Sequence, residues 1–165
     1  RPKVLHTVSA KAYNENESKE LKVMLKTVEK VLLLQELEVF REATSEQLAR
    51  LAIISTERSF VEKEMLFEKG DICGPLQLLV DGRVQLGPPG KGSVVEFTIL
   101  DPLSFFARQS HNTAAAALTS GILLETPHHD LTDLLTSEGE FGWIVLKEIA
   151  RIGRQLMNQQ MLELV

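Results

Sequence analysis

The segment Leu76-Gln-Leu-Leu-Val-Asp-Gly-Arg-Val-Gln-Leu86 decides the fold class of this 165-residue chain. Two short runs rich in Leu and Val flank the dipeptide Asp81-Gly82, and Asp-Gly between such runs is a strong signal for a β-hairpin. The runs are too short for helices and are bounded by turn residues, as expected of strands. The segment therefore predicts two short antiparallel strands joined by a tight turn.

Further strand patterns lie on both sides of this segment. Strands are predicted over residues 58–62, 65–68, 94–100, 114–118 and 122–125. The loop over residues 87–92 is rich in Gly and Pro and is interpreted as a hairpin connection. Several short strands with turns between them are typical of an all-β sandwich or barrel. We therefore expect an antiparallel jelly-roll barrel over residues 58–126.

Helical periodicity precedes the barrel. Apolar residues recur at three- and four-residue spacing from Ser18 to about Leu34, which indicates one face of an amphipathic helix. Residues 44–47 (Thr-Ser-Glu-Gln) have the form of a capping box at the start of a second helix. We expect N-terminal helices over residues 18–57, after a linker or disordered segment over residues 1–17.

Helical periodicity also follows the barrel, over residues 127–165. Thr126 is expected to cap a helix that has Pro127 at its first position. A longer apolar pattern begins near Glu140 and reaches the C-terminal residues, with Gly153 as a point where this helix could bend or break. The whole pattern predicts one domain that is mainly β, with helices at both ends.

Charge and composition exclude several classes of function. The formal net charge is −5, and no Lys/Arg cluster offers the basic face that nonspecific nucleic-acid binding requires. No apolar run approaches the ~20 residues that cross a bilayer. The single cysteine, Cys73, cannot form an intrachain disulfide, which favours a reducing compartment. Because the sequence begins at Arg1 rather than Met, we expect it to be part of a longer protein.

Five short pieces of the chain carry a resemblance to a known family. They are Val28-Glu-Lys-Val-Leu-Leu-Leu34, Glu38-Val-Phe40, Leu48-Ala-Arg-Leu-Ala52, Phe67-Glu-Lys-Gly-Asp71 and Leu79-Val-Asp-Gly-Arg-Val84. Their order, and that of the predicted elements, resembles the cyclic-nucleotide-binding domain family over residues 28–156. The N-terminal helices are especially similar to those of the cyclic-nucleotide-binding-like domain attached to some HEAT-repeat, nucleotide-transporter-like membrane proteins.

In that family, a cradle reading roughly Phe-Gly-Glu, then a short helix and loop, then Arg-x-Ala holds the ligand. The resemblance implies that backbone amides and the Arg bind the cyclic phosphate, while the Glu binds a ribose hydroxyl. Here Ala107 and Arg108 stand at the Gly and Glu positions, and residues 112–114 (Asn-Thr-Ala) stand at Arg-x-Ala. Only three residues lie between Arg108 and Asn112, too few for the helix and loop. Losing two charge-assisted hydrogen bonds removes roughly 3–6 kcal/mol, so we expect no meaningful binding of cyclic AMP or cyclic GMP.

Two interpretations of the remaining pocket stay open. Its residues are Phe106, Ala107, Arg108, His111, Asn112 and Thr113. Arg108, His111 and Asn112 could present donors to another anion, such as a linear nucleotide or a phosphorylated metabolite. Alternatively, they are loop residues on a solvated rim, because an anion site also needs converging backbone amides.

No catalytic, cofactor or metal site is expected from the sequence. The run His128-His-Asp130 suggests a metal trio, but adjacent helical residues point about 100° apart and do not easily hold one ion. Cys73 has no basic sequence neighbour that would lower its pKa, so it is expected to be inert. No nucleophile, base and orienting group can be assembled from these patterns.

These observations favour a non-catalytic regulatory or interaction module whose barrel has lost its cyclic nucleotide. We expect its partners to be other domains of a parent protein, or a second copy, bound through the terminal helices. Nucleic acid is not an expected partner, and a membrane is expected only indirectly, through the parent chain. The expected location is intracellular. The alternative is a sensor for another small anionic ligand, held near Arg108 and His111.

Overall fold

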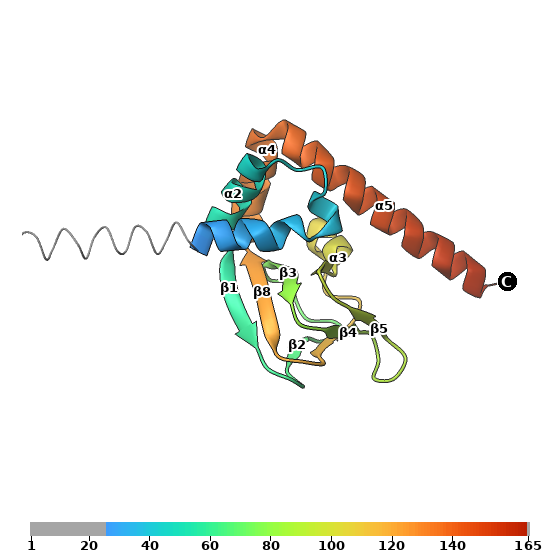
Figure 1. Cartoon of the computed structure of the whole chain (residues 1–165). Coiled ribbons are helices and arrows are strands. Elements are labelled where there is room, and N and C mark those ends of the chain that lie inside the picture. The colour runs from blue at the N-terminus through green and yellow to red at the C-terminus, as the bar shows by residue number, and fades with distance from the viewer. Residues whose placement is uncertain (1–25, 165) are drawn as a thin grey trace, which may run out of the picture.

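The structure is a computed structural model that describes residues 26–164 (Figure 1). It has two four-stranded antiparallel sheets with helices gathered on one side, which confirms the predicted fold class. The linker expected over residues 1–17, and residues 18–25 of the expected first helix, lie outside the described residues. Within the described part of the chain, no helix is long and apolar enough to span a membrane.

Eight short strands form the two sheets. They are β1 (Thr56–Phe60), β2 (Met65–Phe67), β3 (Leu76–Asp81), β4 (Val84–Leu86), β5 (Ser93–Val95), β6 (Thr98–Leu100), β7 (Ala115–Ala117) and β8 (Gly121–Thr126). The first sheet has the order β1-β8-β3-β6 and the second has the order β2-β7-β4-β5. Each sheet therefore takes strands from the whole length of the barrel, and the chain crosses repeatedly from one sheet to the other.

Helices lie before, within and after the strands. A helix over residues 26–35 comes first. It is followed by η1 (Glu38–Phe40), α2 (Ser45–Ile54), α3 (Pro102–Ala107), α4 (His128–Ser137) and α5 (Gly139–Glu163). The capping box predicted for α2 is confirmed: Thr44 Oγ1 accepts a hydrogen bond from the Gln47 amide, and Gln47 Oε1 accepts one from the Thr44 amide.

The central strands of the first sheet, β3 and β8, are largely buried on both faces. One core lies between the two sheets and includes Leu79 and Leu123 of the first sheet and Val84 and Ala115 of the second. A second core lies between the other face of the first sheet and the helices, where Leu78 of β3 packs in the same cluster as Phe141 of α5 and others. Because both faces are covered, five consecutive residues of β3 are buried instead of alternating with exposed ones.

The hairpin predicted at Asp81-Gly82 is wrong. Asp81 pairs with Ile122 in the first sheet, whereas Val84 pairs with Ala117 in the second, so β3 and β4 are not partners. The dipeptide instead carries the chain from one sheet to the other. Gly82 adopts a φ of +92° at this crossing, a conformation that suits glycine.

The single strand predicted over residues 94–100 is also corrected. It divides into β5 in the second sheet and β6 in the first. Phe97 lies between them with a φ of +45°, which turns the chain from one sheet toward the other. The loop over residues 87–92 does join a pair of adjacent strands, since β4 and β5 pair in antiparallel register.

Thr126 does not cap α4 as expected. Pro127 is the N-cap residue, and no side chain caps the helix. Thr126 is still part of β8, is fully buried, and places its Oγ1 2.7 Å from Ser55 Oγ. Since the Ser55 hydroxyl donates to the Leu51 carbonyl (2.7 Å), the Thr126 hydroxyl is the donor between the two. This bond joins the end of the barrel to the end of α2.

Replacing Thr126 by valine keeps the side chain's shape and removes this bond. We expect the free energy of unfolding to fall by about 1 kcal/mol, because a buried hydrogen bond is lost while Ser55 keeps its other partner. Chemical denaturation of the wild type and the variant measures the change. The matched control is Thr136→Val on the exposed face of α4, for which we expect a change within about 0.5 kcal/mol. Equal effects at the two positions would contradict the role given to Thr126.

The last helix has the expected length and is more regular than expected. α5 runs without a break through Gly153, and its C-terminal end extends beyond the barrel (Figure 1). Gly142 lies where α5 crosses α4, and a Cβ there would stand 2.5 Å from the Leu135 carbonyl oxygen. This glycine therefore permits the two helices to pack closely.

Candidate functional site

The segment expected to form the ligand cradle folds around α3. Asp101 is the N-cap residue, with its backbone in the left-handed region (φ 45°, ψ 56°), and Pro102 follows at the start of the helix. The Oδ1 atom of Asp101 accepts a hydrogen bond from the Ser104 amide (3.4 Å). Arg108 closes the other end of α3, also in the left-handed region.

The position of the short helix differs from the order that the resemblance implies. α3 ends at Ala107, with Arg108 as its C-cap, whereas the family order has its short helix after these two positions. The residues that begin the helix are Asp101 and Pro102, and the loop to β7 then contains His111. Asp-Pro is a recognisable signal for a helix start, with an acceptor at the N-cap and a proline at the next position, and it was missed in the sequence.

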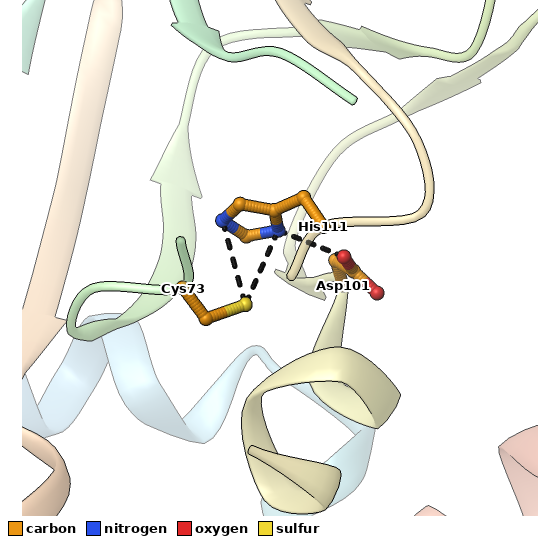
Figure 2. A group of neighbouring side chains, drawn as sticks. All are labelled: Cys73, Asp101 and His111. Atoms are coloured by element: carbon orange, nitrogen blue, oxygen red, sulfur yellow. Dashed lines mark hydrogen bonds and ion pairs between the residues drawn. The ribbon is translucent and has the colours of Figure 1, made fainter. Parts of the chain in front are cut away.

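Three chemically reactive side chains meet beside this helix start (Figure 2). His111 Nδ1 lies 2.8 Å from Asp101 Oδ2, and Cys73 Sγ lies 3.4 Å from Nδ1 and 3.6 Å from Nε2 of the same ring. Cys73 comes from the loop between β2 and β3, Asp101 from the start of α3, and His111 from the loop before β7. Residues far apart in the sequence thus form one cluster, which we call the Cys–His–Asp cluster.

The imidazole of His111 is held on several sides. The His111 amide donates to the Asp71 carbonyl (2.9 Å), and the His111 carbonyl accepts from the Gly70 amide (2.7 Å). The ring stacks on Phe67, with centroids 3.7 Å apart and planes 6° apart. The side chains of His111 and Asp101 are only 11% and 5% exposed. The cluster is therefore a fixed, mostly buried polar group beside the barrel.

The electrostatics of the cluster do not favour a nucleophilic cysteine. Burial raises the pKa of the Cys73 thiol, and the neighbouring Asp101 carboxylate raises it further. A reactive cysteine instead needs surroundings that lower its thiol pKa. The structure does bring a thiol, an imidazole and a carboxylate together, which the sequence patterns could not assemble, but the raised thiol pKa does not favour a nucleophilic thiolate.

The other expected pocket residues lie elsewhere. Arg108 is exposed and places its Nη1 3.0 Å from His128 Nδ1 of α4, and it lines the same small cavity as Cys73. Burial lowers the pKa of His128, and the charges of Arg108 and His129 lower it further. Phe106 and Arg108 line a groove of about 570 Å³ bordered by α4 and α5.

The remaining expected residues contribute less. Ala107 and Asn112 are exposed, and Thr113 is half-buried in the loop before β7. His129, the neighbour of His128, lies 3.4 Å from Asp133 on the exposed face of α4. Of the residues predicted to form a pocket remnant, the structure therefore brings only His111 into the Cys–His–Asp cluster.

Solved structures similar to this chain identify the fold. The N-terminal domain of a transcriptional regulator from Streptomyces coelicolor A3(2) is 27% identical, with a TM-score of 0.61 over 73% of this chain and 89% of that one. The Catabolite Activator Protein of Thermus thermophilus is 18% identical, with a TM-score of 0.65 over 75% of this chain and 62% of that one. PfPKA-R with cAMP bound is 13% identical, with a TM-score of 0.69 over 84% of this chain and 49% of that one.

This chain has the fold of the cyclic-nucleotide-binding domains. The sequence comparisons add nothing to this result, since no protein-family profile and no curated protein matches the chain. The chain spans about half the length of the PfPKA-R chain and less than two thirds of the Catabolite Activator Protein chain. The fold is shared with regulatory proteins, and the residues of the cradle must decide what this member of the fold binds.

Proposed function

We propose that this chain is a non-catalytic regulatory or interaction module that keeps the cyclic-nucleotide-binding fold and does not bind cyclic nucleotides. The observation that carries the proposal is the position of Asp101. Its carboxylate accepts the hydrogen bond of the Ser104 amide at the start of α3, beside His111 in the predicted cradle. A second anion there would meet a negative charge and an amide that is already bonded.

The rest of the cradle supports the same conclusion. His111 gives one ring face to Phe67 and a nitrogen to Asp101, so its polar atoms are engaged by the protein itself. The space between the sheets is filled by apolar side chains of both sheets, including Phe60, Leu100 and Ala117. Arg108 is the one arginine between Ile99 and Leu118, and its side chain faces His128 and solvent.

We further propose that the module acts within a longer protein in an intracellular compartment, with any membrane association made through other parts of the parent chain. The regulatory nature of the similar structures supports this, because two of them contain substantial additional chain beyond the shared fold. We propose that the helices beside the barrel connect it to the next domain of the parent protein.

The interaction surface we propose is the C-terminal end of α5. Exposed apolar side chains gather there beyond the barrel, namely Leu156, Met157, Met161, Leu162 and Leu164. A helix end with this much exposed apolar surface is expected to be covered by another helix of the parent protein or of a second copy.

A double substitution tests this surface. If the chain self-associates through α5, light scattering of the wild type gives a dimer mass, and Met157→Glu with Met161→Glu returns it to the monomer because two charges cannot be buried in an apolar contact. The matched control is Glu148→Gln with Arg154→Gln on the same helix, for which the dimer mass is retained. A wild-type dimer that survives the double glutamate variant would show that the contact lies elsewhere.

One further observation favours the alternative of a sensor for another anion. A small cavity of about 190 Å³ is lined by Arg108, Gln109, Ser110 and other residues at the end of α3. Arginine and hydroxyl groups around a cavity could hold a phosphorylated compound.

A thermal-shift panel separates the two functions. A ligand at 100 times its dissociation constant stabilises the folded state by about 2.7 kcal/mol, so a functioning site raises the melting temperature measurably. With cyclic AMP, cyclic GMP, linear nucleotides and phosphorylated sugars, we expect no shift. A shift with a phosphorylated compound that is abolished by Arg108→Ala would instead establish the sensor.

A further inference from the structure

Three side chains that can each bind a metal ion lie together in the Cys–His–Asp cluster. The possible ligand atoms of Cys73, Asp101 and His111 all lie within 4.8 Å of one another. A thiolate sulfur, an imidazole nitrogen and a carboxylate oxygen are the three donor types that Zn²⁺ takes in proteins. Mg²⁺ and Ca²⁺ prefer oxygen ligands alone, so this donor set discriminates against them.

The three groups are close enough to share a tetrahedral ion after local side-chain movement. With Zn–S and Zn–N bonds of about 2.3 and 2.1 Å, tetrahedral geometry separates the sulfur and nitrogen by roughly 3.6 Å. Cys73 Sγ lies 3.4 and 3.6 Å from the two nitrogens of His111, so it is near enough, but it lies along the lone pair of neither nitrogen and the Cys73 side chain must rotate for both residues to bind one ion. The 2.8 Å contact between His111 and Asp101 is a hydrogen bond, and it must lengthen by roughly half an ångström for both groups to bind one tetrahedral ion.

The three ligands are positioned by the surrounding protein before any ion binds. The Asp101 carboxylate has one oxygen on the Ser104 amide, which leaves Oδ2 directed at His111 (Figure 2). Backbone hydrogen bonds tie His111 to Gly70 and Asp71, in the same loop that carries Cys73. Because the loops hold one another, binding an ion would require little reordering of the chain, which favours affinity.

The cluster also has access to solvent. Cys73 is half-buried and lines the 190 Å³ cavity at the end of α3, next to residues such as Ser110. That cavity is large enough for water molecules and lies on the thiol side of the cluster. It offers a route for an ion and room for a water molecule as the fourth ligand, an arrangement found at open zinc sites.

We propose that Cys73, Asp101 and His111 form a Zn²⁺ site with three protein ligands and one open position, and that the Cys73 thiol releases its proton to solvent as the ion binds. The site goes beyond the proposed regulatory function and does not depend on it. The ion would brace the start of α3 against the loops at the end of the barrel. Binding an ion there joins the loop before β3, the start of α3 and the loop before β7.

Cobalt substitution tests the site directly. Cys73 is the only cysteine of the chain, so a thiolate-to-cobalt charge-transfer band in the near ultraviolet can arise from this side chain alone. We expect the reduced protein to develop that band with Co²⁺, to saturate at one equivalent, and to lose the band when Zn²⁺ is added. Absence of the band at saturating Co²⁺ would overturn the proposal.

Ligand variants test the other two positions. Asp101→Asn and His111→Gln keep Cys73. We expect each variant to weaken Co²⁺ binding by at least ~100-fold, because the loss of a residue that only supports a metal ligand already weakens binding by up to that factor. Asparagine tolerates the left-handed backbone and can still cap α3, so the first variant is expected to fold. The matched control is His129→Gln, which removes the exposed His129–Asp133 pair and is expected to leave the affinity unchanged. Wild-type affinity in both ligand variants would overturn the proposal.

Nuclear magnetic resonance of the wild type decides the matter if a ligand variant does not fold. Added Zn²⁺ is expected to shift the imidazole resonances of His111 first, at one equivalent and in slow exchange. Shifts confined to His128 and His129 would show that the ion binds only on the surface of α4, and would contradict the site.

Discussion

Replacing Gly121 by alanine is expected to lower the free energy of unfolding by about 3 kcal/mol or more, the upper end of what added atoms cost in a packed interior. A Cβ at this position would overlap the Asp81 carbonyl oxygen and would stand 2.5 Å from Cζ of the buried Phe60 ring. The overlap is with backbone, so a rotamer change cannot relieve it. Gly121 begins β8 beside the crossing between the two sheets, and a shift there disturbs both. Chemical denaturation followed by circular dichroism measures the loss.

Gly74→Ala is the matched control for this prediction. Gly74 has an ordinary backbone conformation, and nothing lies within 4 Å of a Cβ added there. We expect the free energy of unfolding to change by less than about 1 kcal/mol. A small increase is the usual result when alanine replaces a glycine without strain. Similar stabilities for the two alanine variants would mean that the strand crossing is not packed as described.

Replacing Phe141 by alanine is expected to cost about 3–5 kcal/mol, the usual effect of deleting a buried aromatic ring. Phe141 is fully buried at the start of α5, and its ring lies 5.9 Å from that of Phe40 in η1. The same core contains Leu78 and Leu124 of the first sheet, so this ring joins the N-terminal helices, the last helix and the barrel. Thermal and chemical unfolding curves provide the measurement.

Trp143 offers the control on the same helix. It has a larger side chain, but 59% of it is exposed. We expect Trp143→Ala to change the free energy of unfolding by no more than about 0.5 kcal/mol, as is usual for surface positions. If Trp143→Ala cost as much as Phe141→Ala, the helices would pack on the barrel through a different face of α5.

The sequence contained enough local information for the strands and helices, and too little for their connections. The spacing of apolar residues predicted most elements to within a few positions. The Asp81-Gly82 turn was misassigned because a hairpin and a crossing share the same local signal. The residues that decide between them are distant: Asp81 pairs with Ile122, 41 residues later, and Val84 pairs with Ala117, 33 residues later. Thr126 was misassigned for a similar reason, since its hydroxyl bonds to the distant Ser55 rather than to the helix that follows it.

The Cys–His–Asp cluster could not be predicted from sequence patterns. Cys73, Asp101 and His111 have no common spacing, and each is unremarkable among its sequence neighbours. They meet only because the barrel brings three loops together at one end of α3. A local clue did exist for one of them, since Asp101-Pro102 is a helix-start signal that predicts the short helix α3 directly after it.

Isothermal titration calorimetry with cyclic AMP and cyclic GMP tests the central claim most directly. The proposal rests on the Asp101 carboxylate at the start of α3, which already binds the Ser104 amide, and on the His111 ring, which is stacked on Phe67. We predict no saturable heat with either nucleotide at millimolar concentration, on a sample shown to be folded by its circular dichroism spectrum. A saturable isotherm with one site per chain and a low-micromolar dissociation constant would contradict the account.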